Sequence, residues 1–176
     1  MSQTTAPTTA DDPVHGARHA FRPSDENPEN LIVDTWLEPG GALPKHFHPI
    51  QEEHWQVLEG EIRFHLDGTD RTLTPADGVV IVAPGMRHAL KNGSGASAHL
   101  RCEVIPALHL EEFLTESAEA AREGLFRRGG IPTGPRGLRW AASFLRRHRD
   151  ETVMTFPPQF AQRAMIALFA GRADGA

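Results

Sequence analysis

The chain has 176 residues, of which 39% are hydrophobic, and a formal net charge of −5, which suits one globular domain with an appendage. No stretch approaches the roughly 18 apolar residues that a membrane helix needs, so we expect no membrane span. The single cysteine, Cys102, excludes an internal disulfide and fits a reducing cytoplasm.

Charge is unevenly distributed along the chain. Up to residue 120, Asp and Glu outnumber Lys and Arg by 19 to 8, and beyond it Lys and Arg outnumber Asp and Glu by 10 to 4. This pattern fits two solvated faces of opposite sign, or a basic tail that docks on an acidic surface of its own barrel or of a partner subunit. We expect no nucleic-acid partner, because the arginines lack interleaved aromatic residues and the acidic half would repel phosphate.

Residues 1–14 are polar and rich in proline and threonine, and we predict a disordered leader there. The segment has neither a basic region nor an apolar one of the kind that a secretory signal combines. We therefore expect no secretory signal and a cytoplasmic location.

Residues 15–106 are predicted to form a β-barrel. Turn signals separate short apolar or alternating runs, and Asp67-Gly68 is a tight hairpin signal. The predicted strands include Leu31–Leu37, Trp55–Leu58, Ile62–Leu66, Val79–Val82 and Ala98–Ile105.

Residues 107–176 change to a helical period and are predicted to form a helical extension. One apolar face begins at Leu110 and its helix is expected to end at Gly129-Gly130. A second helix is predicted from Pro135 to Arg149, and a third begins near Pro157-Pro158. The third presents an apolar set: Phe160, Ala164, Ala167 and Leu168.

Four residues are candidate ligands of one metal ion: His46, His48, Glu53 and His88. Residues i and i+2 of a strand share a face, so the two histidines of the His-Phe-His segment would converge. Glu53 adds a carboxylate after the turn at Pro49, and His88 adds an imidazole from another strand. Imidazole suits Fe, Zn, Cu and Ni, and a carboxylate admits Mn.

Other Glu and His residues along the chain are weaker candidates for this set. Glu52 is the rival carboxylate, whereas alternation along the strand turns His54 to the opposite face. His65 and His99 are expected to be hydrogen-bonded or exposed rather than ligands.

The spacing of these residues resembles the first conserved motif of the cupin superfamily, with Gly40, His46, His48, Glu53 and Gly60 in register. The segment from Asp77 to Asn92 is similar to the second motif, in which Gly85, His88 and Asn92 match. Ala83 stands where that motif has proline, and Asp77-Gly78 reverses its Gly-Asp. The tail is also similar to that of small single-domain bacterial cupins.

The resemblance implies a mainly β fold, the double-stranded β-helix or jelly-roll barrel, with a C-terminal helical appendage. Glu53 is favoured over Glu52 by the six-residue step to Gly60. The pocket expected inside this barrel is apolar, lined by Phe47, Trp55, Val57, Ile62, Phe64, Ile81 and Leu90.

The last strand, Ala98–Ile105, poses a choice between two alternating faces. Leu100, Cys102 and Val104 are the safer core set, and the alternative places Arg101 and Glu103 along the pocket. Cys102 is expected to be a small buried hydrophobe. Met86 and Arg87 are expected to rim the mouth.

We expect one divalent metal ion and a small-molecule substrate. Fe(II) is the favoured metal, with Mn, Zn, Ni or Cu as alternatives. Three function classes stay open: an oxygenase or dioxygenase of an enol, phenol or carboxylate; a redox-neutral isomerase, cyclase or lyase; and a binding protein without turnover. A homodimer is predicted, because barrel edges and apolar helix faces must be covered.

Overall fold

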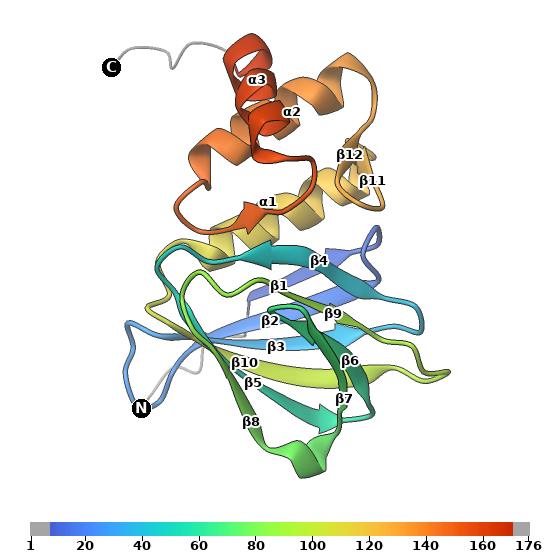
Figure 1. Cartoon of the computed structure of the whole chain (residues 1–176), viewed down its shortest axis with the longest axis vertical. Helices are drawn as coiled ribbons and strands as arrows, with labels where there is room; N and C mark the ends of the chain where they lie inside the picture. Colours follow the sequence, from blue (N-terminus) through green and yellow to red (C-terminus); the bar gives the residue numbers. More distant parts are fainter. Residues whose placement is uncertain (1–7, 171–176) are drawn as a thin grey trace.

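The computed structural model describes residues 8–170, which form two β-sheets with a layer of helices at one end (Figure 1). The first sheet has six strands in the order β1-β2-β3-β10-β5-β8, all antiparallel. Its strands are β1 (Thr8–Asp12), β2 (Ala17–Pro23), β3 (Leu31–Leu37), β5 (Glu52–Glu59), β8 (Val79–Val82) and β10 (Ala98–Ile105).

The second sheet has five strands in the order β13-β4-β9-β6-β7. They are β4 (Ala42–Phe47), β6 (Ile62–Leu66), β7 (Thr69–Leu73), β9 (His88–Lys91) and β13 (Val153–Met154). Asp67 and Gly68 join β6 to β7 with positive φ angles of 46° and 94°, which a two-residue hairpin turn requires. The predicted hairpin is therefore confirmed.

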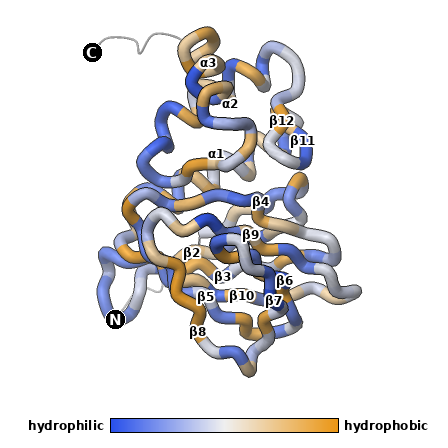
Figure 2. The backbone as a smooth tube through the Cα atoms, in the orientation of Figure 1, coloured by the Kyte–Doolittle hydropathy of each residue, from blue (hydrophilic) through white to orange (hydrophobic). Residues whose placement is uncertain are grey.

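The core lies between the two sheets, where buried apolar residues of both form one cluster. Hydrophobic residues occur along strands of both sheets (Figure 2). Phe64 and Leu90 of the second sheet are almost fully buried, as are Leu100, Cys102 and Val104 of the first. The predicted mainly β fold with C-terminal helices is confirmed, as a sandwich-like barrel of two sheets rather than a closed one.

The apolar face of β10 is the core face, which settles the choice left open for that strand. Arg101 and Glu103 point away from the core. Arg101 donates two hydrogen bonds, of 3.1 and 3.0 Å, to the two oxygens of the Asp34 carboxylate. Glu103 accepts a hydrogen bond from Ser24. Paired in this way, neither charge lines the cavity described below.

Three helices follow the sheets: α1 (Leu110–Arg122), α2 (Gly134–Arg147) and α3 (Gln159–Phe169). A 3-10 turn, η1 (Pro75–Asp77), precedes β8, and strands β11 (Phe126–Arg127) and β12 (Ile131–Pro132) form a small hairpin. The first helix ends at Arg122, earlier than predicted, because Gly124 takes a φ of +68° and the chain turns there. Gly129 and Gly130, where the first helix was predicted to end, form the turn of the β11–β12 hairpin instead.

Two segments expected to be disordered or helical are strands. Residues 8–12, within the predicted leader, form β1 because Ala10 and Asp12 are buried and α1 packs against this strand. Residues 1–7 of that leader lie outside the described residues. Within the tail, β13 pairs with β4 and so extends the second sheet.

The predicted apolar face of α3 points to solvent in this single chain. Phe160 and Leu168 are 77% and 75% exposed, and Ala164 and Ala167 are exposed as well. The helix is anchored instead by Gln162, whose amide donates to the backbone oxygens of Met154 and Pro157. Among residues 8–170, no helix is long and apolar enough to cross a membrane.

Candidate metal centre

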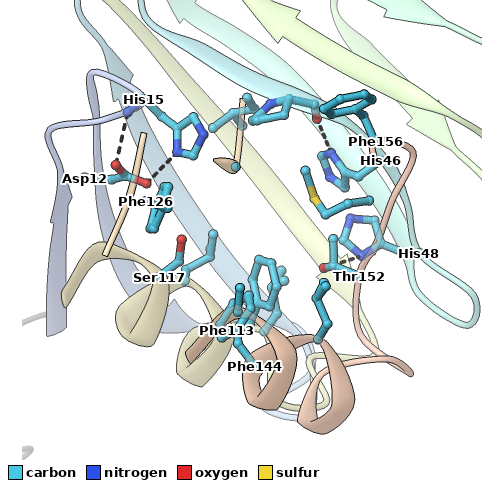
Figure 3. A pocket seen from close by; sticks show the side chains of 18 of the residues that line it. Asp12, His15, His46, His48, Phe113, Ser117, Phe126, Phe144, Thr152 and Phe156 are labelled. Atoms are coloured by element: carbon cyan, nitrogen blue, oxygen red, sulfur yellow. Dashed lines mark hydrogen bonds and ion pairs between the residues drawn. The ribbon is translucent and has the colours of Figure 1, made fainter. Parts of the chain in front are cut away.

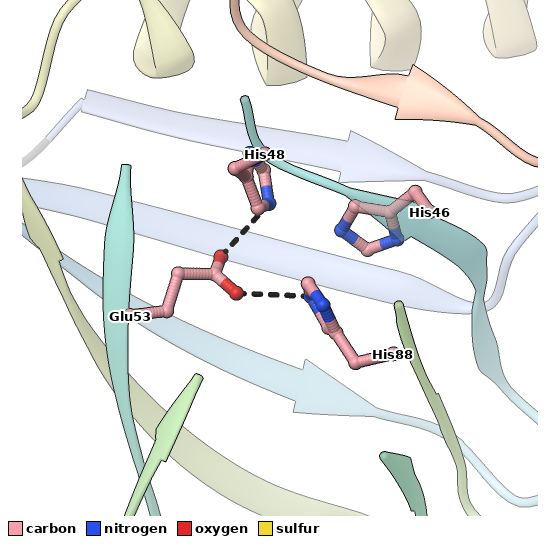
Figure 4. Close-up of side chains that lie close together, drawn as sticks. All are labelled: His46, His48, Glu53 and His88. Atoms are coloured by element: carbon pink, nitrogen blue, oxygen red, sulfur yellow. Dashed lines mark ion pairs between the residues drawn. The ribbon is translucent and has the colours of Figure 1, made fainter. Parts of the chain in front are cut away.

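The four predicted ligands meet between the two sheets, at the end that faces the helices (Figure 4). His46 lies on β4 and His48 directly after it; Glu53 lies on β5 and His88 begins β9. His46 and His88 are register partners in the β4–β9 ladder, next to an irregularity in that pairing. One nitrogen or oxygen atom from each of the four residues lies within 4.8 Å of the others.

The Nδ1 atom of each histidine in this group points at a backbone carbonyl oxygen. His46 donates to Pro44 at 2.6 Å, His48 to Glu151 at 2.7 Å and His88 to Met86 at 3.2 Å. A carbonyl oxygen only accepts, so each Nδ1 carries the proton and each neutral ring keeps a lone pair on Nε2. Histidines that ligate metals are oriented by this kind of partner.

The Nε2 atoms face the Glu53 carboxylate without hydrogen-bonding to it. Nε2 of His48 lies 3.1 Å from Oε1, and Nε2 of His88 lies 2.9 Å from Oε2. Neither nitrogen has a hydrogen-bond partner among residues 8–170, although both are buried. Two lone pairs and a carboxylate converging in a buried space repel one another unless a cation lies between them. The donor set therefore fits one divalent metal ion.

The surroundings favour the ligating protonation state of Glu53 and His46, whereas at His48 a proton competes with the metal. Burial raises the pKa of Glu53, but its interactions with His48 and His88 outweigh burial and hold this pKa well below its usual range. Trp55 Nε1 also donates to Glu53 at 3.0 Å. Burial and the two neighbouring histidines lower the pKa of His46 well below 6.5. Burial lowers the pKa of His48, but the charge of Glu53 outweighs it and raises the net value.

The rival residues lie outside the cluster. Glu52 points away and accepts from His54 Nε2 at 2.7 Å, on the opposite face of β5. His65 pairs with Asp70, and His99 pairs with Asp34. The choice of Glu53, which rested on the six-residue step to Gly60, agrees with the structure, in which Glu53, Trp55 and Val57 are the buried residues of β5.

A cavity of about 160 Å³ opens beside the cluster, between the sheets and the helices (Figure 3). His46, His48 and Glu53 line it, together with Trp55 on the sheet side. The tail supplies most of the remaining wall: Leu110, Phe113, Leu114, Ser117, Phe126, Trp140, Phe144, Thr152, Met154, Phe156 and Met165. This volume is close to the roughly 150 Å³ of a dry cavity that holds a benzene-sized molecule.

The predicted pocket residues need correction, because Trp55 alone of the seven lines this cavity. Val57, Ile62, Phe64 and Leu90 are buried side chains that fill the barrel below the cluster. The remaining two, Phe47 and Ile81, do not line the cavity either. Ile81 is 54% exposed, because Val80 and Val82 are the inward residues of β8.

The residues expected at the rim also lie elsewhere. Met86 packs against the barrel core and Arg87 is exposed, and neither lines the cavity. Gly85, at a φ of +81°, donates its backbone N–H to the backbone oxygen of His48. This turn thus holds the segment before His88 against the segment that carries His48.

Residues 35–104 match the family described as the cupin domain. The region is a cupin domain. It contains all four members of the metal cluster. Its first motif ends at Gly60, where a φ of +81° and the close approach of Ala98 disfavour any side chain. Its second motif ends at Asn92, a buried residue whose amide donates to the backbone oxygens of Leu37 and Ala96.

Similar proteins share this cupin domain rather than the whole chain. An oxidoreductase of Arthrobotrys oligospora is 41% identical over 51 residues, which are 29% of this chain and 20% of that protein. The polyketide synthase CurC of Streptomyces cyaneus is 31% identical over 70 residues, 40% of this chain and 45% of that protein. The chain thus spans less than half of the length of these curated relatives.

Among solved structures, an RmlC-like cupin of Shewanella frigidimarina has a TM-score of 0.52 at 22% identity. The match covers 63% of this chain and 94% of that one, and it shows the shared fold.

Outside the cupin domain, sequence reasoning missed the polar residues of the cavity. Asp12 and His15 lie at the β1–β2 turn, and His19 lies on β2. Their sequence signal is weak, because Asp-x-x-His is short and the surrounding segment is polar. The apolar stripes of α1 and α2 were visible, and they are the residues that wall the cavity.

Proposed function

We propose that this chain is a metal-dependent oxygenase or dioxygenase that acts on a small enol, phenol or carboxylate. The observation that carries the proposal is the arrangement of unpaired Nε2 atoms around Glu53 at the wall of an apolar cavity. Fe(II) is the metal we favour, with Mn, Zn, Ni and Cu as alternatives.

His46, His48, Glu53 and His88 would hold the ion. An ion with four protein ligands keeps open positions, at which it supplies Lewis-acid or one-electron chemistry to a bound substrate. The carbonyl partners of the three Nδ1 atoms hold the imidazoles in the ligating tautomer, so that binding requires no reorientation of the rings.

The other cavity residues select and orient the substrate. Phe113 and Phe144 lie with ring centroids 4.9 Å apart, and Trp140 stacks on Phe144 at 4.8 Å. Such a wall excludes water and favours a flat apolar molecule. The cavity volume limits that molecule to about the size of a single ring.

The name of one similar protein supports a redox role. The Arthrobotrys relative is called an oxidoreductase, and the alignment with it is the most identical of those reported above. The Streptomyces relative is called a polyketide synthase. A redox-neutral isomerase or cyclase is the second candidate, favoured by His15 on the cavity wall, because its imidazole offers a proton-transfer group.

Two measurements on the full chain, purified without added metal, test the proposal. Elemental analysis identifies the bound metal, and oxygen uptake is then measured with panels of enols and catechols. Bound iron with oxygen uptake, lost in Glu53→Gln and kept in Glu52→Gln, is the expected result. Bound zinc without uptake would overturn the oxygenase and favour the redox-neutral enzyme or a binding protein.

A further inference from the structure

A second cluster of polar groups lies on the cavity wall away from the metal ligands. Figure 3 shows Asp12 and His15 on one side of the cavity, with His46 and His48 on the other. Asp12 ends β1, and His15 lies in the turn before β2. This pair belongs to neither cupin motif.

Asp12 fixes the tautomer of His15. Its Oδ2 atom lies 2.7 Å from His15 Nδ1, and its Oδ1 atom accepts the backbone N–H groups of Val14 and His15. Burial raises the pKa of Asp12, but the hydrogen bonds from His15 and from the backbone outweigh burial and lower it. Asp12 is thus an ionised acceptor, so the His15 proton sits on Nδ1 and the lone pair sits on Nε2.

The Nε2 atom of His15 is left without a partner. It is buried, and among residues 8–170 no donor or acceptor reaches it. The His15 side chain is 13% exposed and contacts the Phe126 ring, whose centroid is 5.8 Å away. A buried acceptor without a donor costs free energy, so a ligand hydroxyl that donates to it gains a partner that the protein does not supply.

We propose that His15 is a catalytic base that takes the hydroxyl proton of a phenol or enol bound in the cavity, with Asp12 as its positioning residue. In this step the ligand O–H bond breaks, an Nε2–H bond forms, and an oxyanion and an imidazolium remain as an ion pair. Asp12 stabilises the imidazolium, as a carboxylate does beside a catalytic histidine.

The neighbouring histidine, His19, is not the base. His19 contacts Thr35 at 3.0 Å, and burial lowers its pKa to about 4, so it stays neutral as the ligand ionises. The inference rests on the proposed function only in taking the cavity as the substrate site. It deepens that proposal by naming the substrate class as a single-ring weak acid.

The probe for the test is 4-nitrophenol, whose phenol and phenolate forms absorb at different wavelengths. It is added to the full chain, as purified and again after chelator treatment, at a pH where the free probe is mostly protonated. The wild-type protein should bind it as phenolate in both preparations. His15→Gln should bind it as neutral phenol and about 10-fold more weakly, and Asp12→Asn should reduce the ionised fraction.

His65→Gln is the matched control, because His65 contacts Asp70 at 2.6 Å in a similar pair that does not line the cavity. It should ionise the probe like the wild type. Equal ionisation in His15→Gln, or no binding of the probe by the wild-type protein, would overturn the inference. If the wild-type protein takes up oxygen but binds the probe in its neutral form, this inference is wrong and the proposed function still stands.

A second measurement needs no folded variant. Nitrogen NMR of the wild-type histidine side chains should show His15 protonated at Nδ1 alone and, once the probe is added, at both nitrogens. A ring that stays singly protonated beside an ionised probe would contradict the proposal.

Discussion

The sheets and the helical tail contribute different parts of one site. The sheets hold the metal cluster, whose donor atoms lie within 4.8 Å of one another, whereas the tail supplies most of the cavity wall. The two parts are joined at His48, whose Nδ1 donates to the backbone oxygen of Glu151 in the tail. The cupin domain thus holds the metal cluster, and the tail encloses most of the cavity beside it.

The largest expected effect concerns the carboxylate of the sheet part. Glu53→Gln should weaken metal binding by more than about 100-fold, because even the loss of a ligand's outer partner costs 10- to 100-fold. Glu52→Gln, the adjacent control, should leave the affinity within about twofold, because Glu52 faces His54 on the other side of β5. Metal titration by calorimetry measures both variants, and the reverse order of effects would show that the register of β5 is off by one.

The second-largest effect is expected in the helical tail, on the free energy of unfolding. Phe144→Ala should reduce the free energy of unfolding by about 3–5 kcal/mol, because a buried aromatic ring leaves a cavity when it is removed. Ile131→Ala should change it by less than about 1 kcal/mol, since that side chain of β12 is 54% exposed. Denaturant unfolding followed by circular dichroism compares the two. Equal losses would mean that the tail does not pack as described.

Acid should release the metal from the sheets. The pKa of His48 is raised, so its proton competes with the metal at a higher pH than an ordinary histidine proton would. The lowered pKa values of His46 and Glu53 keep both ready to ligate as the pH falls. Affinity should therefore drop through pH 6.5 and the metal should be lost progressively below about pH 6, in a metal-binding titration against pH. Undiminished affinity at pH 5 would argue against histidine ligation.

The smallest effect is expected on assembly, where the homodimer stays a prediction. The exposed side chains of α3 are the apolar surface that a partner copy would cover. Phe160→Glu should then shift the full chain from dimer to monomer in light scattering, without loss of metal. A monomeric wild-type protein would contradict the prediction.

The metal cluster could be predicted because its residues follow a fixed spacing. Glu53 and His88 were identified by their spacing in the two cupin motifs, whereas His46 and His48 share one face of a strand by alternation. The same rule failed for Ile81, because the run Val79–Val82 is apolar throughout and offers no alternation to read.

The cavity wall could not be predicted, because it depends on contacts between distant segments. Strand β1 has a polar sequence and is ordered by packing against α1, about a hundred residues away in the chain. Phe144 and Trp140 show an apolar stripe in the sequence, but which surface that stripe covers depends on how the tail folds back. Asp12 and His15 become a pair at the cavity only through that packing.

Metal content of the purified full chain tests the central claim most directly. We expect about one divalent ion per chain in the wild-type protein, measured by elemental analysis against protein concentration. The double variant His46→Ala/His48→Ala should be nearly free of metal while its circular dichroism spectrum is retained, because two of the four ligands are gone. Full loading of the double variant would contradict the account.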